Sequence, residues 1–195
     1  MTDTDLFPQL VIPETLAAGP GPGNTDARVL ASFANAGLAD HMQADVLRGM
    51  IECKHMLRQV WGTKNTYTLG VAGTGWSGLD ALFSAILPGD SVVCFVNGTF
   101  SGIDALTVRT RAATREDLKA SALDPKPASV TVIQVPHGQS VTGEIVERAL
   151  AQHKPTWAVM AHWETGSGRI NDIRGFSDAC LRHNVMGLVD AVSSL

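Results

Sequence analysis

Asp190 carries a carboxylate at the end of the apolar stretch "VMGLVD", close to the last residue. A carboxylate at the tip of an interior strand is costly to remove from water unless a positive or hydrogen-bonding group meets it. That partner can be an arginine or lysine of the protein, or a cofactor nitrogen that the carboxylate keeps protonated. An isolated aspartate at a strand end can also cap the turn that follows. The neighbouring motifs therefore have to distinguish these roles.

The stretch "AGTGWSG" has the spacing G-x-G-x-x-G and lies between an apolar run and a helical stretch. Its glycines are Gly73, Gly75 and Gly78. Dinucleotide sites with this spacing also need an acid at the tip of the second strand, about 20 residues further on. Here that strand ends in Asn97, and Asp90 precedes it. Thr74 and the amides of a helix start can still bind one phosphate monoester. A tight turn without a ligand is the alternative.

Phe100 follows the second apolar run, in "NGTFSG". A ring at this place could stack on a flat heteroaromatic ligand, and the alternative is a core phenylalanine at a helix start. Parallel sheets bind their ligands at the carboxyl ends of the strands. A phosphate loop, a stacking ring and a ring-nitrogen carboxylate on successive strand tips match what pyridoxal 5'-phosphate requires. We therefore expect this cofactor.

Longer stretches carry a resemblance to a known family. "GPGPGN" resembles a substrate loop, "AGTGWSGLDALFSAILPGDSV" a phosphate loop with its helix, "HWETGSGRINDI" a fourth-strand loop, and "GLVDAVSSL" an aspartate signature. Together they resemble the class V aminotransferases, which depend on pyridoxal phosphate and include the alanine–glyoxylate, serine–glyoxylate and serine–pyruvate enzymes. The resemblance extends from about Ala18 to the last residue.

The resemblance implies a role for each site residue. The cofactor phosphate is expected on the glycine loop, at Gly73, Thr74, Gly75 and Trp76. The pyridine ring is expected among residues at strand ends, namely Phe100, Thr165, Asp190 and Val192. Phe100 would stack on the ring, Asp190 would pair with its nitrogen as the catalytic carboxylate, and Val192 would cover the opposite face. Gly21 and Asn24 would face the substrate. No metal is expected, and His162 and Glu164 are interpreted as a hydrogen-bonded pair near the cofactor.

The resemblance also implies the reaction, transfer of an amino group from a small amino acid of the alanine or serine type to glyoxylate or pyruvate. The family's Schiff-base lysine follows the aspartate by about one strand, and no lysine of this chain fits that position. We therefore expect the front half of a homodimeric enzyme, inactive by itself. Other possibilities are a desulfurase, a lyase or an aminoethylphosphonate transaminase of the same fold, a nucleotide-binding oxidoreductase, and a binding module without activity.

The elements that must position these residues follow from the apolar pattern. Short apolar runs separated by helical stretches predict an α/β fold with three layers and a mainly parallel sheet. The expected strands are 66–71, 91–96, 129–135, 157–162 and 186–189. Apolar residues at helical spacing predict a helix with one buried face from His41 to Trp61. The resemblance implies an arm with a substrate loop at 1–25 and the first part of an aspartate-aminotransferase-like large domain at 26–195.

Composition limits the class of protein. With 45% hydrophobic and 17% charged residues the chain is globular in character, and a net charge of -4 without a basic cluster disfavours nucleic acid. No apolar stretch reaches the roughly 20 residues of a membrane span, and the first residues lack the features of a signal peptide, so a cytoplasmic location is expected. The three cysteines are expected to be reduced and buried, at Cys53, Cys94 and Cys180.

Overall fold

The computed structural model describes residues 13, 15–17, 19, 21–34, 40–117 and 128–195, and the side chains of 113–117 are outside this description. The chain divides into two compact units, Met1–Gly49 and Met50–Leu195. The first unit contains α2 (Ala27–Ala34) and the beginning of α3 (Ala44–Val60). The predicted boundary between residues 25 and 26 stays a prediction.

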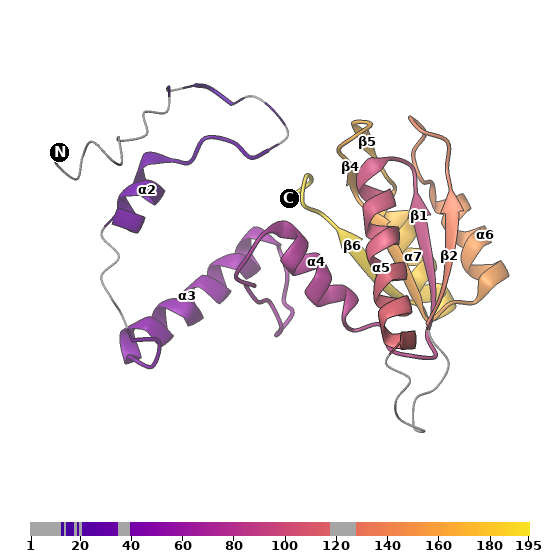
Figure 1. Cartoon of the computed structure of the whole chain (residues 1–195), viewed down its shortest axis with the longest axis horizontal. Helices are drawn as coiled ribbons and strands as arrows, with labels where there is room; N and C mark the ends of the chain where they lie inside the picture. Colours follow the sequence, from indigo (N-terminus) through magenta and orange to yellow (C-terminus); the bar gives the residue numbers. More distant parts are fainter. Residues whose placement is uncertain (1–12, 14, 18, 20, 35–39, 118–127) are drawn as a thin grey trace, which may run out of the picture. The chain divides into compact units, whose positions relative to one another are not determined.

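A parallel sheet of four strands forms the centre of the second unit (Figure 1). The strands are β1 (Ser91–Val96), β2 (Ser129–Gln134), β3 (Trp157–Ala161) and β6 (Met186–Asp190). Their order is β2-β1-β3-β6. The register places Val96 opposite Gln134, and Ala161 opposite Asp190. The carboxyl ends of the strands therefore lie along one edge, and four of the five predicted strands are confirmed.

Helices cover both faces of the sheet, which explains why its inner strands β1 and β3 are apolar without alternation (Figure 1). On one face α6 (Gly143–His153) and α7 (Ile173–His183) pack on Phe95 and Met160. The rings of Phe95 and Phe176 meet edge to face, with centroids 6.2 Å apart. On the other face α4 (Gly75–Phe83) and α5 (Thr99–Asp117) pack on Val92, Cys94 and Val96. The predicted three-layer arrangement is confirmed.

One carboxylate organises the starts of α6 and α7. Asp172 caps α7 by accepting a hydrogen bond from the amide of Gly175 (2.9 Å), and its other oxygen accepts from the amide of Gly143 at the start of α6 (3.2 Å). A β-carbon on Gly175 would lie 2.6 Å from the Cα of Gly143. The two helices therefore approach this closely only because glycine occupies the crossing.

The predicted strand at 66–71 is wrong, since these residues form no strand. Tyr67 is 86% exposed and Leu69 is 70% exposed. An apolar run becomes a strand only where a sheet edge pairs with its backbone groups, and 66–71 pairs with neither edge of the described sheet. A feature that the pattern did not predict is the antiparallel pair of β4 (Trp163–Glu164) and β5 (Arg169–Ile170).

The predicted helix at 41–61 is confirmed as α3, but its predicted buried face is not. None of its residues is buried, and its apolar side chains, such as Met50, Met56 and Val60, are exposed. Cys53 on this helix is exposed as well, so the prediction of three buried cysteines is correct only for Cys94 and Cys180. Periodicity predicts which side of a helix is apolar, and the presence of a covering element decides whether that side is buried.

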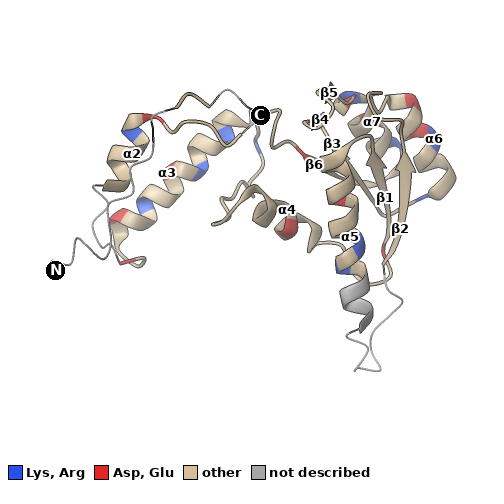
Figure 2. Cartoon of the chain, turned by 45° about the horizontal axis from the view of Figure 1, so that its top comes forward, with Lys and Arg blue, Asp and Glu red and all other residues tan. Residues whose placement is uncertain are grey.

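Basic and acidic residues are interspersed along the described helices, as on α3 and α6 (Figure 2). These two helices therefore lack the basic stripe that binds nucleic-acid backbones. Among the described residues, no helix has the length and apolar character needed to cross a bilayer.

Candidate functional site

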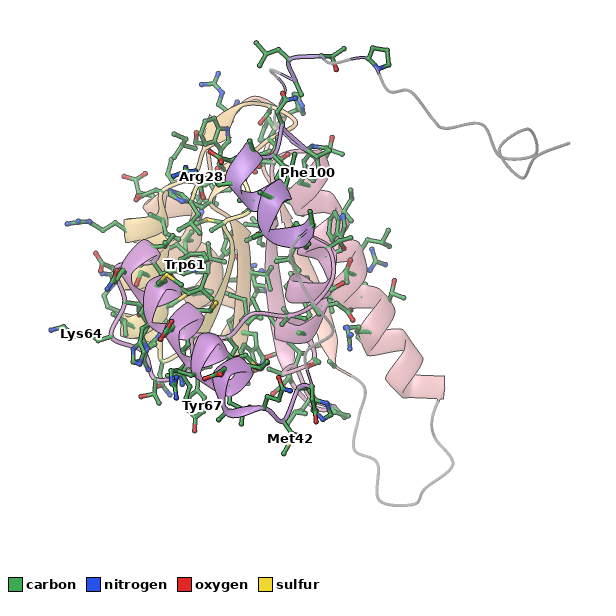
Figure 3. The ribbon with its side chains drawn as sticks, turned by 90° about the vertical axis from the view of Figure 1, so that its left-hand side faces the viewer. Arg28, Met42, Trp61, Lys64, Tyr67 and Phe100 are labelled. Atoms are coloured by element: carbon green, nitrogen blue, oxygen red, sulfur yellow. The ribbon has the colours of Figure 1, made fainter. Side chains whose placement is uncertain are left out.

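A cavity of about 700 Å³ lies at the carboxyl end of β6, within the second unit. Small-molecule sites typically have volumes of about 300–1,000 Å³. The cavity is lined by the segment after α3, by the glycine loop with the start of α4, and by the end of β6. Among the residues predicted to bind a cofactor, the structure brings together on this cavity Gly73, Thr74, Gly75, Asp190 and Val192. Trp61 and Tyr67, labelled in Figure 3, line the same cavity from the segment after α3.

The glycine loop has a backbone that only glycine supports at its first position. Gly73 has a φ of +143°, and a β-carbon there would lie 2.4 Å from Oγ of Ser77. Thr74 occupies the N-cap position of α4, yet its side chain makes no capping hydrogen bond. The hydroxyl of Thr74 and the first amides of α4 are therefore available to an anion at the positive end of the helix dipole.

Asp190 is 9% exposed and ends β6. Its Oδ1 accepts a hydrogen bond from the amide of Val192 (2.9 Å), so the carboxylate does cap the turn that follows, as one interpretation of the sequence expected. None of the ion pairs among the described residues includes Asp190. A largely desolvated carboxylate without a cationic partner lines the cavity, and such a group favours a ligand that brings a positive charge.

Two contacts connect the loop after β6 to its neighbours. A β-carbon on Gly75 would lie 3.6 Å from Cγ2 of Val192, so Val192 lies beside the glycine loop. The hydroxyl oxygens of Thr165 and Ser193 are 2.5 Å apart and share a hydrogen bond. Thr165 does not line the cavity, but this bond ties it to the loop that does. Ser193 had no expected role, although it directly follows Val192 within the motif "GLVDAVSSL".

Phe100 and Trp76 do not line the cavity. Phe100 lies in the first turn of α5 and is 36% exposed (Figure 3), and Trp76 lies in the first turn of α4 and is 40% exposed. Both occupy helix starts at the carboxyl edge of the sheet, as expected. Their predicted contacts with a cofactor stay predictions.

Gly21 and Asn24 belong to the first unit. The side chain of Asn24 accepts a hydrogen bond from the amide of Ala17 (2.7 Å) and donates one to the carbonyl of Thr15 (2.8 Å). Gly21 has a φ of +120°, which side chains rarely adopt. These interactions shape the loop itself, and its contact with a substrate stays a prediction.

Glu164 has a different partner from the one expected. Instead of pairing with His162, its carboxylate accepts hydrogen bonds from the hydroxyl and amide of Ser101 (2.6 and 2.9 Å) and from the amides of Phe100 (3.2 Å) and Gly166 (3.1 Å). Burial raises the pKa of Glu164, but the hydrogen bonds from Ser101 and the amides outweigh it, so the pKa lies below its usual value. Glu164 therefore caps the start of α5 as an anion.

A pair of buried amides also holds the strand ends, and the sequence analysis did not identify it. Nδ2 of Asn97 donates to Oδ1 of Asn171 (2.9 Å) and to the carbonyl of Gln139 (2.8 Å). Nδ2 of Asn171 donates to the carbonyl of Ala161 at the end of β3 (2.8 Å). A polar residue directly after the apolar run "VVCFV" was the available signal. Among the described residues, no cluster of three or more metal-ligating side chains accompanies this network.

Comparisons with known proteins agree with this geometry. The chain is 35% identical over 191 residues to alanine–glyoxylate aminotransferase of Rattus norvegicus, covering 97% of this chain and 42% of that protein. It is 26% identical over 190 residues to (S)-ureidoglycine–glyoxylate transaminase of Bacillus subtilis (strain 168), covering 96% and 41%. Among solved structures it matches alanine–glyoxylate aminotransferase of Nostoc sp. with a TM-score of 0.83 and 30% identity, covering 95% of this chain and 45% of that one. No protein-family model matches the chain.

The similarity to aminotransferases that the sequence motifs indicate is thus confirmed, and it extends over nearly the whole length of this chain. Its α/β fold matches that of the corresponding part of the Nostoc structure, as predicted. The chain spans about two fifths of the length of these curated relatives.

Proposed function

We propose that the chain forms the pyridoxal-phosphate-binding front part of a class V aminotransferase. The enzyme would transfer an amino group from a small amino acid, such as alanine or serine, to glyoxylate or pyruvate. The observation that carries the proposal is the position of Asp190, a buried carboxylate without a cationic partner among the described residues, on the same cavity as the glycine loop. The names of the relatives support the amino transfer.

The described residues fit the cofactor. Gly73 allows the turn before α4 to pass close to Ser77, where the β-carbon of any other residue would collide. The hydroxyl of Thr74 makes no capping hydrogen bond to α4, so it can donate to a phosphate oxygen. Asp190 supplies the anion that a protonated pyridine nitrogen requires. Val192, beside Gly75, would bound the ring on one face, and Phe100 at the start of α5 would bound it on the other.

In such enzymes pyridoxal phosphate withdraws electrons from the substrate's α-carbon and so makes its proton removable. The described residues of this chain would keep one proton on the ring nitrogen of the cofactor. The carboxylate of Asp190 raises the proton affinity of a ring nitrogen beside it, because separating the ion pair in a medium of low dielectric is unfavourable. Thr74 and the amides of α4 orient the phosphate end, which sets the position of the ring relative to Asp190.

Asp190→Asn in the full-length protein tests the proposal. The variant keeps the shape of the side chain and its acceptor for the amide of Val192, but loses the charge. We expect cofactor binding to persist and kcat for transfer between alanine or serine and glyoxylate to fall by about 100-fold or more. Asp178→Asn makes the same chemical change on an exposed residue of α7 and should leave kcat unchanged. Wild-type turnover in Asp190→Asn, or a full-length protein that binds no pyridoxal phosphate, would contradict the proposal.

A homodimer in the cytoplasm is also part of the proposal. The apolar side chains of α3 are exposed in the described chain, and contiguous apolar surface of this kind usually marks an interface. Two of the three cysteines are buried thiols and all three are free, which fits a reducing compartment. Light scattering of the full-length protein should give twice the mass of one chain, and a monomer at micromolar concentration would argue against the dimer.

A further inference from the structure

Asp104 carries a buried carboxylate that the proposed reaction does not use. It lies in α5, is 1% exposed, and both of its carboxylate oxygens lack a hydrogen-bond partner among the described residues. Buried polar groups in native proteins are nearly always hydrogen-bonded, so an aspartate without any partner needs an explanation. Asp104 lies on the buried side of α5, at helical spacing from the buried residues Ser101, Ala105 and Val108.

The titratable groups that act on Asp104 are acidic or neutral. Glu164 of β4 and Asp190 of β6 repel its charge, and the thiol of Cys94 faces it from β1. The neighbouring strands β2 and β3 contain no titratable residue. On the side of α4, Asp80 is already paired with Arg111 of α5. Thus none of the ion pairs among the described residues includes Asp104, Glu164 or Asp190.

The three acids differ in how their charge is stabilised. Glu164 accepts three hydrogen bonds from the start of α5 and one from the amide of Gly166, whereas Asp190 lines the cavity and accepts one, from the amide of Val192. Asp104 accepts none from the described residues. Burial, together with repulsion from Asp190 and Glu164, raises the pKa of Asp104 to about 7. Asp104, buried and without a hydrogen-bond partner among the described residues, therefore holds a proton near neutral pH.

We propose that Asp104 is a positioning residue that acts through Asp190, holding a proton while Asp190 faces no cation and releasing it to water when a cationic ring nitrogen binds there. The inference rests on the proposed function, because it takes the cation to be the pyridine nitrogen of pyridoxal phosphate. A cation beside Asp190 cancels the repulsion that favours protonated Asp104, so Asp104 ionises. Its charge then adds to that of Asp190 and keeps the ring nitrogen protonated at higher pH.

The first experiment tests the coupling of the two acids without any cofactor. In the full-length apo-protein labelled with ¹³C at the aspartate carboxyl carbons, the Asp104 resonance should titrate near neutral pH. In Asp190→Asn it should titrate about one pH unit lower or more, as expected for the loss of one charge at an effective dielectric of about 20. Asp178→Asn is the matched control and should not move it. Titration of Asp104 below pH 5, or the same midpoint in Asp190→Asn, would overturn the coupling.

The second experiment follows the ring nitrogen itself, with pyridoxal phosphate labelled with ¹⁵N in the ring. In wild type and in Asp178→Asn the nitrogen should stay protonated to a pH about one unit higher than in Asp104→Asn. Melting curves of Asp104→Asn show whether the variant is folded. Equal titration of wild type and Asp104→Asn would overturn the positioning role. A wild-type protein that binds no cofactor would overturn the proposed function, and the apo titration would still decide whether Asp104 and Asp190 are coupled.

Discussion

Val192 lies against Gly75, so that a β-carbon added to Gly75 would be 3.6 Å from Cγ2 of Val192. This contact joins the loop after β6 to the start of α4, two segments that are far apart in the sequence. Asp190 and Thr74, whose hydroxyl makes no capping hydrogen bond, consequently line one cavity.

Gly73→Ala should weaken binding of pyridoxal phosphate by about 10-fold or more, equivalent to about 1.4 kcal/mol. The new β-carbon would collide with the side chain of Ser77, and a φ of +143° is strained for any residue with a side chain. The measurement is the dissociation constant of the cofactor in the full-length protein. Gly49→Ala, at a helical position with open space around it, is the control and should leave that constant unchanged. Equal affinity in both variants would show that the loop does not hold the phosphate.

Glu164→Gln should lower the free energy of unfolding by about 1–3 kcal/mol at neutral pH, because a charged cap of α5 becomes neutral. The pKa of Glu164 is lowered in the folded state, so its stabilising effect is full above the unfolded pKa of about 4.5 and is lost as the pH falls through the folded value. Urea unfolding at several pH values should show the difference between wild type and variant shrinking in acid. Glu52→Gln, on the exposed surface of α3, should show no such difference at any pH.

Asp104 should make the protein less stable as the pH rises from about 4 to about 7. Its pKa is raised from 3.8 to about 7 on folding, so between these values the folded state binds a proton that the unfolded state has lost. The free energy of unfolding therefore falls with pH, with a slope approaching about 1.4 kcal/mol per pH unit. Asp104→Asn should remove this slope in urea unfolding of the apo-protein. An unchanged slope would mean that Asp104 is ionised in the folded state.

In the folded but monomeric 195-residue chain, thiol reagents at mildly alkaline pH should modify Cys53 and leave Cys94 and Cys180 unmodified. Cys53 is exposed, whereas burial raises the pKa of Cys94 to about 12, with a contribution from Asp104, and that of Cys180 to about 11. The thiolate is the reactive form, so both buried thiols are inert. Peptide mapping by mass spectrometry gives the result. Labelling of Cys94 as fast as Cys53 would show that the core of the second unit opens readily.

The strands that carry the site could be predicted because a sheet buried on both faces requires apolar runs of strand length. β1 was predicted with the observed bounds, and the predicted end of β6 differs by one residue. The run at 66–71 has the same apolar character but forms no strand. An apolar run becomes a strand only if the unpaired edge of a sheet lies next to it. The apolar pattern of the run does not say whether such an edge is there.

The sequence alone determined the residue types at the strand tips: glycines and a threonine where a phosphate can bind, and an aspartate that needs a positive partner. These follow from local chemistry, because the cost of burying a charge and the freedom of a glycine backbone are properties of the residues themselves. Only the tertiary structure decided which of them meet. Glu164 reaches the start of α5, and the charge of Asp190 on β6 acts on the buried Asp104 of α5. Both depend on how helices and loops from distant parts of the chain pack over the sheet, and local spacing does not encode that packing.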